Sequence, residues 1–147
     1  MADTANLRAS RQKAKAEHFD VLVAGAGISG IGAGHHLKTR LPKKTFVILE
    51  AFDTFGGTWH THRYPGARSD SDLYTFGYRH KPWIGPPIAS RDEILRYLDE
   101  VIRESDLGPH IRYRHRIISA SWSTAKKRWT VKAERLETGE TLTFTAR

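Results

Sequence analysis

A turn with the glycine spacing of a dinucleotide-binding loop lies near the start of the chain, at Gly25, Gly27 and Gly30. Gly25 allows a tight turn, Gly27 lets the backbone approach a pyrophosphate, and Gly30 lets a following helix pack against a preceding strand. The N-terminus of such a helix offers unpaired N–H groups and a partial positive charge to phosphates. Glu50 follows about twenty residues later, where its carboxylate can accept hydrogen bonds from a ribose diol. These residues together predict a dinucleotide site.

The residues on either side of the turn predict the elements that position it. Residues 19–24 form a short, valine-rich apolar run, which favours a β-strand over a helix. Apolar residues then recur at helical spacing as far as Leu41, and a second β-prone run at residues 45–49 leads into Glu50. A glycine motif alone is weak evidence, whereas a motif with both strands, the helix and the acid is specific. The pattern predicts a βαβ unit of a Rossmann fold.

A loop-like segment at residues 55–83 carries a second group of candidate residues. It is rich in glycine, aromatic residues, arginine and aspartate, and loops of this length are usually functional or disordered. Its aromatic content argues against disorder. The pair Gly56-Gly57 permits close backbone approach, and Trp59 can cover a flat ring system. Arg68 and Asp70 follow a Pro-Gly turn, where they can meet a charged ligand.

Other aromatic residues of this segment lead to a different prediction. Tyr74, Phe76 and Tyr78 alternate with other residues in a strand-like pattern. We expect these three side chains to fill a small core rather than to bind a ligand. Residues 57–61 and 68–70 are favoured instead as parts of a binding site.

The second half of the chain is predicted to be scaffold. Ser90 and Glu93 have the spacing of a capping box, and an amphipathic helix follows until Gly108-Pro109 ends it. Residues 110–113 are predicted as a third parallel strand. Three alternating segments then predict an antiparallel meander. On the first of them, one face is expected to carry Ile118, Ala120 and Trp122.

Composition restricts the remaining possibilities. The 147 residues suffice for one domain with a core, and no apolar run approaches the roughly 18 residues of a membrane span. The absence of cysteine excludes disulfides, thiolate metal sites and cysteine nucleophiles. His35 and His36 have no partner at ligand spacing, so we expect no metal site. The N-terminal residues lack the apolar segment of a signal peptide, which favours a cytoplasmic location.

Basic residues exceed acidic ones, and the net charge is +8. Because these residues are scattered and no known nucleic-acid motif is present, we expect no nucleic-acid partner. Residues 1–17 are rich in alanine, arginine and lysine and are predicted to form a basic, flexible tail.

Three motifs at their observed spacings carry a family resemblance: GAGISG at residues 25–30, GGTW at 56–59 and RYPGARSD at 63–70. Together they resemble the start of a class B flavoprotein monooxygenase of the Baeyer–Villiger type, closest to the ethionamide-activating enzymes. The resemblance covers nearly the whole chain from residue 19 onward. It implies an α/β fold, the glutathione-reductase-type FAD-binding Rossmann fold with an antiparallel β-meander. Residues 18–147 are then expected to be the N-terminal part of the FAD-binding domain.

The resemblance also implies roles for individual residues. The pyrophosphate of FAD is expected at Gly25, Gly27, Ser29 and Gly30, and its adenosine ribose at Glu50. The flavin side is expected to be lined by Gly57, Thr58, Trp59, His60 and Thr61. Asp70 is the expected catalytic residue beside the flavin ring, and NADPH is expected to be approached by Arg68, Ser69 and Asp70. Ile117 matches a position that meets the adenine side.

The activity implied by the resemblance is reduction of FAD by NADPH, capture of O2 as a flavin peroxide, and oxygen insertion into a ketone, sulfide or thiocarbonyl compound. Members of the family continue well beyond residue 147. We therefore expect a truncated chain that is inactive alone, without the NADP domain and without a strand that would pair with residues 19–24. A separate chain is a possible source of the missing domain.

Two alternatives remain from the sequence. One is a small NAD(P)-binding Rossmann protein, which would leave the GGTW and YPG segments without a role. The other is a non-enzymatic product, either a basic binding domain or a vestigial fragment.

Overall fold

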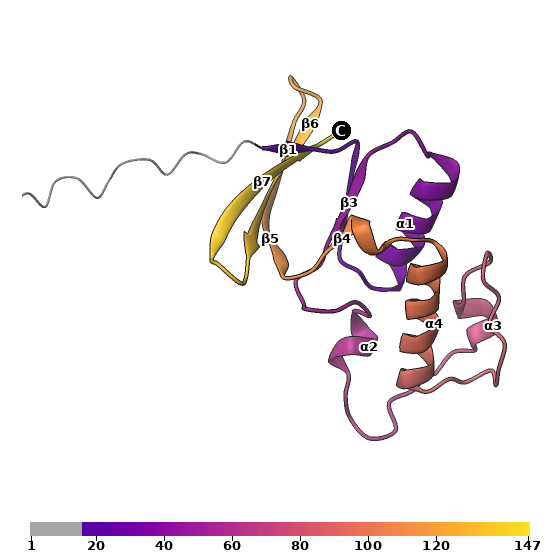
Figure 1. Cartoon of the computed structure of the whole chain (residues 1–147). Coiled ribbons are helices and arrows are strands. Elements are labelled where there is room, and N and C mark those ends of the chain that lie inside the picture. Colours follow the sequence, from indigo (N-terminus) through magenta and orange to yellow (C-terminus); the bar gives the residue numbers. More distant parts are fainter. Residues whose placement is uncertain (1–15) are drawn as a thin grey trace, which may run out of the picture.

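A computed structural model describes residues 16–147 of the chain (Figure 1). Two sheets form its framework, a 3-stranded parallel sheet and a 4-stranded sheet that contains the meander. The parallel sheet lies between the meander and the helices α1 and α4. Most of the predicted basic tail falls on residues 1–15, which lie outside the described residues. Its last residue, Glu17, forms the short strand β1 (Glu17–His18).

The parallel sheet confirms the predicted βαβ unit. Its strands are β2 (Val21–Ala24), β3 (Phe46–Leu49) and β4 (Ile111–Arg112), in the order β2-β3-β4. All four residues of β3 are buried, and they alternate between two cores. Phe46 and Ile48 face the helices, whereas Val47 and Leu49 face the meander. A central parallel strand that is covered on both faces reads as a continuous apolar run, as residues 46–49 do.

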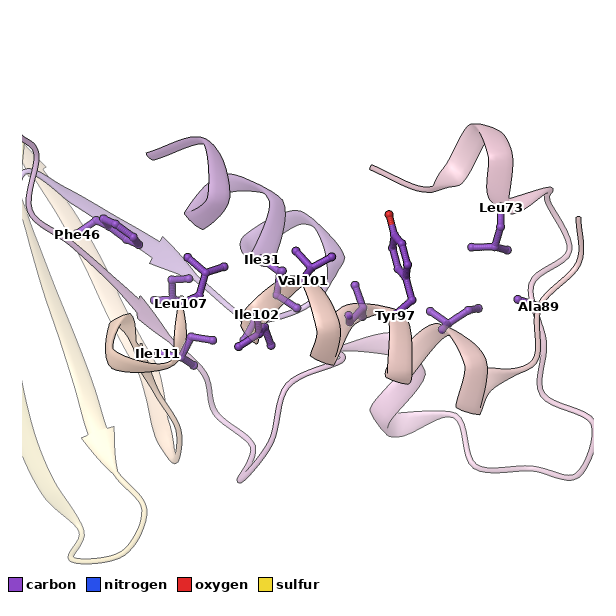
Figure 2. Close-up of a cluster of buried hydrophobic side chains, with 13 residues drawn as sticks. Ile31, Phe46, Leu73, Ala89, Tyr97, Val101, Ile102, Leu107 and Ile111 are labelled. Carbon is purple, nitrogen blue, oxygen red and sulfur yellow. The ribbon is translucent and has the colours of Figure 1, made fainter. Parts of the chain in front are cut away.

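Two helices cover one face of this sheet. The first is α1 (Ile28–Arg40), which follows the glycine turn and ends at the predicted position, with Leu41 as its C-cap. The second is α4 (Arg91–Glu104), whose predicted capping box is present, since the Ser90 hydroxyl accepts the Glu93 N–H and the Glu93 carboxylate accepts the Ser90 N–H. Figure 2 shows the shared core, in which Ile31 of α1 and Val101 of α4 lie beside the parallel strands.

The predicted meander is confirmed and covers the other face. It consists of β5 (His115–Ser123), β6 (Arg128–Arg135) and β7 (Glu140–Ala146). Strand β1 adds to it in parallel with β7, which gives the order β1-β7-β6-β5. Phe144 and Ala133 are fully buried against Val47 and Leu49.

The predicted face of β5 is wrong at Ile118. A bulge between Ile117 and Ser119 breaks the alternation, so Ile117 pairs with Ala133 and packs into the core. Ile118 is consequently 51% exposed. A bulge inserts one extra residue and moves the preceding side chains to the other face.

The strand-like prediction for residues 74–78 is also wrong. The short helix α3 (Leu73–Phe76) occupies this stretch, and the Asp72 carboxylate caps it by accepting the Thr75 N–H at 2.9 Å. The fully buried Leu73 fixes this turn to the body of the protein. A local cap together with one buried anchor outweighs a three-residue alternation. The remaining short elements are α2 (Thr58–Thr61) and the 3₁₀ turn η1 (Gly108–His110).

Candidate cofactor-binding site

A cavity of about 380 Å³ opens where β2 ends and α1 begins. We call it the turn cavity. Its lining residues are Ala24, Gly25, Gly27, Ile28, Ser29, Gly30, Gly56, Gly57, Thr58, Trp59 and Phe76. The cavity therefore brings together the glycine turn and the GGTW segment, which are far apart in the sequence. Ligands of open α/β folds bind at this carboxyl end of the parallel strands.

The glycine turn needs its glycines for different reasons. Gly25 has a φ of 90°, a region that L side chains rarely adopt. A Cβ on Gly30 would lie 1.9 Å from the carbonyl oxygen of Gly25, so no side chain fits there. A Cβ on Gly27 would instead meet only ordinary contacts, the nearest being the Gly57 Cα at 3.6 Å. A methyl group at Gly27 would therefore fit without a clash, but it would fill the space beside the Gly57 backbone in the wall of the cavity.

The N-terminus of α1 is free of side-chain caps. Its N-cap, Gly27, makes no side-chain hydrogen bond, and the first turn of α1 contains no acidic residue. The last turn carries Lys38 and Arg40. The unpaired N–H groups and the positive end of the helix dipole are therefore directed at the turn cavity, an arrangement that favours an anionic ligand.

Glu50 lies beneath this turn and is 5% exposed. Its Oε2 accepts the backbone N–H of Ala26 at 2.7 Å, and its Oε1 accepts that of Phe52 at 2.8 Å. The carboxylate thus connects the end of β3 to the glycine turn. Each oxygen keeps a second lone pair for another donor, so the ribose contact stays a prediction.

The Gly56-Gly57 pair lies directly against the glycine turn. Gly56 donates its N–H to the Ala26 carbonyl at 2.9 Å, and both glycines have positive φ angles, 115° and 53°. A Cβ on Gly57 would lie 3.1 Å from the Gly27 Cα, and a Cβ on Gly56 would lie 2.5 Å from the Leu95 side chain, so each position favours glycine for its own reason. The pair therefore builds one wall of the turn cavity.

The predicted flavin-side residues divide into two groups. Thr58 and Trp59 line the turn cavity, and Trp59 meets Phe76 edge to face, with ring centroids 6.2 Å apart. The lining does not include His60 and Thr61. The His60 ring lies 5.1 Å from that of Phe52, and the Thr61 hydroxyl donates to the Thr58 carbonyl at 3.1 Å.

Residues 68–70 lie outside the turn cavity. Ser69 is buried, donates its N–H to the Ala89 carbonyl at 2.9 Å and accepts the Ala89 N–H on its hydroxyl at 3.1 Å. Arg68 forms an isolated bridge with Ser90. Asp70 is exposed. Ser69 therefore attaches the loop to the start of α4, and the catalytic role of Asp70 stays a prediction.

Ile117 lies at a second cavity of about 350 Å³, which we call the edge cavity. Its lining residues are Val21, Leu22, Ala24, Ile117, Ala120, Trp129, Val131, Ala146 and Arg147. One wall is the outer edge of β2, and the other is the inner face of the meander. The adenine-side role of Ile117 stays a prediction.

Comparisons with known proteins agree with this arrangement. A family model of the NAD(P)-binding Rossmann-like domain matches residues 23–86. FAD-containing monooxygenase EthA of Mycobacterium tuberculosis is 51% identical over 116 residues, which are 78% of this chain and 24% of EthA. An oxidized steroid monooxygenase bound to NADP aligns with a TM-score of 0.74 and 34% identity, over 86% of this chain and 25% of that one. A closed cyclohexanone monooxygenase aligns with a TM-score of 0.74 and 32% identity, over 89% and 25%.

The chain is homologous to one part of the FAD-containing monooxygenases. It spans about a quarter of the length of the relatives that it matches. The fold prediction is confirmed, including the Rossmann-like unit and the antiparallel meander. Among residues 16–147, no helix is both long and apolar enough to cross a bilayer, and no cluster of three or more His, Asp or Glu side chains is arranged for a metal ion.

Several residues that line the turn cavity were not predicted as site residues: Ala24, Ile28, Gly56 and Phe76. Ala24 and Ile28 follow from their places beside the glycine turn. Phe76 was expected in a small core, and the sequence signal that would have placed it is the helix-capping pair Asp72 and Thr75. A helix over residues 73–76 turns Phe76 toward Trp59.

Proposed function

We propose that this chain forms the FAD-binding region of an NADPH- and O2-dependent monooxygenase. The observation that supports the proposal best is the turn cavity, where an uncapped helix N-terminus meets five glycines and two aromatic rings. On this proposal the complete enzyme inserts oxygen into ketones, sulfides or thiocarbonyl compounds. When bound, FAD supplies the redox chemistry for that insertion.

The residues present fit a dinucleotide. The Gly27 position offers a place that a Cβ would fill, and the pyrophosphate is proposed there, on Gly25, Gly27, Ser29 and Gly30. All lining side chains of the turn cavity are uncharged, so no carboxylate within the described residues repels a phosphate from that lining. Glu50 holds the turn in place from below and is proposed to contact the adenosine ribose. The isoalloxazine is proposed to lie along Gly57, Thr58 and Trp59, with His60 and Thr61 farther out.

The chain's own contribution to the reaction is binding and orientation. The free N–H groups of the first turn of α1 fix the diphosphate without rearrangement, because α1 is already anchored in the core through Ile31. Trp59 and Phe76 give the site an apolar wall that excludes water from one side. Asp70 is proposed to act beside the flavin, and Arg68 and Ser69 toward NADPH, once the rest of the enzyme is present.

The test is an FAD titration of the purified 147-residue chain, followed by flavin fluorescence and by the thermal unfolding midpoint. We expect FAD to raise the midpoint. Gly27→Ala should weaken FAD binding about tenfold, since the added methyl occupies the space next to the pyrophosphate. Gly108→Ala is the matched control, because a Cβ at Gly108 meets nothing within 4 Å.

The same titration separates the alternatives. Binding of NADPH without binding of FAD would contradict the proposal and favour a small NAD(P)-binding Rossmann protein. Binding of neither cofactor would contradict it in favour of a vestigial product. Equal FAD affinity in Gly27→Ala and Gly108→Ala would contradict the proposal that FAD binds in the turn cavity.

The edge cavity supports a further part of the proposal, that another strand of the enzyme pairs with β2. Within residues 16–147, β3 is the only strand beside β2, and the apolar side chains of β2 are partly exposed while those of β3 are buried. We propose that the strand comes from the remaining part of the monooxygenase, in the same or a separate polypeptide. Mixing this chain with the rest of M. tuberculosis EthA and measuring NADPH oxidation with a ketone, a sulfide and a thiocarbonyl compound tests this. Failure of the two parts to associate would contradict it.

A cytoplasmic location also stays a prediction. Fractionation of cells that express the native gene would check it, and recovery with the membrane or culture medium would contradict it.

A further inference from the structure

Tyr78 inserts its side chain behind the first turn of α1. Its hydroxyl donates a hydrogen bond to the carbonyl oxygen of Ile28, the first residue of the helix. The ring lies against Gly32, where a Cβ would come within 2.8 Å of the Tyr78 Cε1. The absence of a side chain at Gly32 therefore creates the notch that admits the ring.

Tyr78 is held on its other side by α4. The Tyr97 hydroxyl accepts the backbone N–H of Tyr78 at 2.7 Å and donates to the Lys81 carbonyl at 2.6 Å. The two tyrosine rings stack with centroids 5.7 Å apart. Tyr97 is 5% exposed and belongs to the core shown in Figure 2. Tyr78 thus links a rigid part of α4 to the start of α1.

The phenol of Tyr78 remains protonated in the physiological range. Burial, as the largest cause, raises its pKa well above the ordinary value. The hydroxyl is therefore a permanent hydrogen-bond donor to the Ile28 carbonyl.

The segment that carries Tyr78 is connected to the turn cavity in two ways, through the hydrogen bond to Ile28 of α1 and through Phe76. Ile28, which accepts its hydroxyl, lines the cavity next to the pyrophosphate position. Phe76, two residues before Tyr78, also lines the cavity and meets Trp59 edge to face. A shift of this segment would therefore move the diphosphate-binding turn and the aromatic wall together.

We infer that Tyr78 is a positioning residue for the diphosphate of the dinucleotide cofactor. It fixes the first turn of α1 through the hydrogen bonds that connect Tyr97, Tyr78 and Ile28. The inference rests on the proposed FAD-binding function. Tyr78 touches no cofactor atom on this account. It acts through the backbone of Ile28 and the N–H groups that follow.

The primary test compares Tyr78→Phe with Tyr74→Phe in the full chain. Both variants remove one tyrosine hydroxyl that donates to a carbonyl, since the Tyr74 hydroxyl donates to Gly85 at 2.7 Å on the exposed side of α3. We expect FAD affinity to fall about fivefold in Tyr78→Phe, as for the loss of one hydrogen bond, and to remain unchanged in Tyr74→Phe. Equal affinities in the two variants would overturn the inference.

A second readout needs no cofactor. Amide hydrogen exchange of the Ile31 N–H, which donates to the Gly27 carbonyl at 3.0 Å, should be about fivefold faster in Tyr78→Phe than in Tyr74→Phe, because the first turn opens more often. Equal exchange rates would overturn the inference. If the wild-type chain fails to bind FAD, the proposed function falls, and the exchange rates alone decide whether Tyr78 fixes the turn.

Gly32→Ala provides an independent variant. Alanine in a helix interior normally stabilises relative to glycine, yet here its Cβ displaces the Tyr78 ring. We expect Gly32→Ala to weaken FAD binding without a matching fall in the thermal unfolding midpoint of the chain. A residue with a purely structural role would change both. Unchanged FAD affinity in Gly32→Ala would count against the inference.

Discussion

The Glu50 carboxylate accepts the backbone N–H of Ala26 at 2.7 Å, which joins the end of β3 to the middle of the glycine turn. An acid at this position was predicted to bind a ribose. The structure shows that it also determines where the turn lies. Because Glu50 is 5% exposed, the N–H groups that it satisfies have no ready access to water when it is removed.

Replacement of Glu50 should therefore destabilise the cofactor-free chain. In Glu50→Ala, the N–H groups of Ala26 and Phe52 lose their acceptors, and we expect a loss of about 2–3 kcal/mol in urea unfolding. Glu137→Ala, at an exposed carboxylate, serves as the control and should change the stability by less than about 0.5 kcal/mol. Glu50→Gln keeps one acceptor oxygen for the turn but removes the negative charge, so we expect weaker flavin binding. A flavin affinity equal to that of the wild type would contradict a charge-assisted ribose contact.

The loop at residues 68–70 offers a test that separates attachment from catalysis. Ser69→Ala removes the buried acceptor of the Ala89 N–H, and we expect a loss of about 1–2 kcal/mol in urea unfolding. Asp70→Asn should leave the stability of the isolated chain unchanged and lower NADPH-dependent oxygenation in the assembled enzyme. The prediction for Ser69 is wrong if Ser71→Ala, at an exposed neighbour, is equally destabilising.

A bulge in β5 predicts that two adjacent isoleucines contribute unequally to stability. Ile117→Ala should cost about 1–3 kcal/mol, because the side chain packs against the core of the meander. Ile118→Ala should cost less than about 0.5 kcal/mol, since Ile118 is 51% exposed. Thermal unfolding of the two variants measures both. A larger effect at Ile118 would mean that the strand follows the regular alternation instead.

Acid should loosen the contact between α1 and the segment after α3. The imidazoles of His35 and His80 stack with centroids 3.4 Å apart, and His36 meets both rings edge to face. Burial, followed by the neighbouring histidines, lowers the pKa of both His35 and His80 from the ordinary value of 6.5. A base with a lowered folded-state pKa contributes stability that is present above pH 6.5 and is lost as the pH falls below it.

The charged groups around this stack are Arg40 of α1, Lys81, and Glu104 of α4, of which only Glu104 favours a protonated His80. Below pH 6.5, we expect the thermal unfolding midpoint of His80→Ala to decrease less steeply with falling pH than that of the wild type. His62→Ala, outside the stack, should show the wild-type slope. The same slope in both variants would contradict a role for the stack.

The βαβ unit could be predicted because its signals are local. The glycine positions, the valine-rich run before them and the capping box at Ser90 each act within a few residues of the structure that they specify. The meander followed from its alternation in the same way. The strands of the parallel sheet were placed within one or two residues, whereas α4 ends at Glu104, before the predicted stop at Gly108-Pro109.

The remaining features depend on contacts that the sequence does not display. The partners of Glu50 and Ser69 are backbone N–H groups, which every residue except proline possesses and which no motif marks. Phe76 reaches the turn cavity only because Leu73 is anchored in the core. Asp70 was placed by family resemblance alone, and its exposed side chain lies outside the lining of the turn cavity.

The pairing of β1 with β7 has a consequence for synthesis of the protein. Glu17 is in register with Phe144, so the first strand described joins the sheet through the last one, across a separation of 127 residues at the His18–Thr145 hydrogen bond. At about 5–20 residues per second, translation delivers the partner on the order of ten seconds after β1 has emerged. During that interval Phe19 and Leu22 lack the side chain of Phe144 against which they pack. We therefore expect β1 to pair with β7 only near the end of synthesis, after the residues of the βαβ unit have emerged.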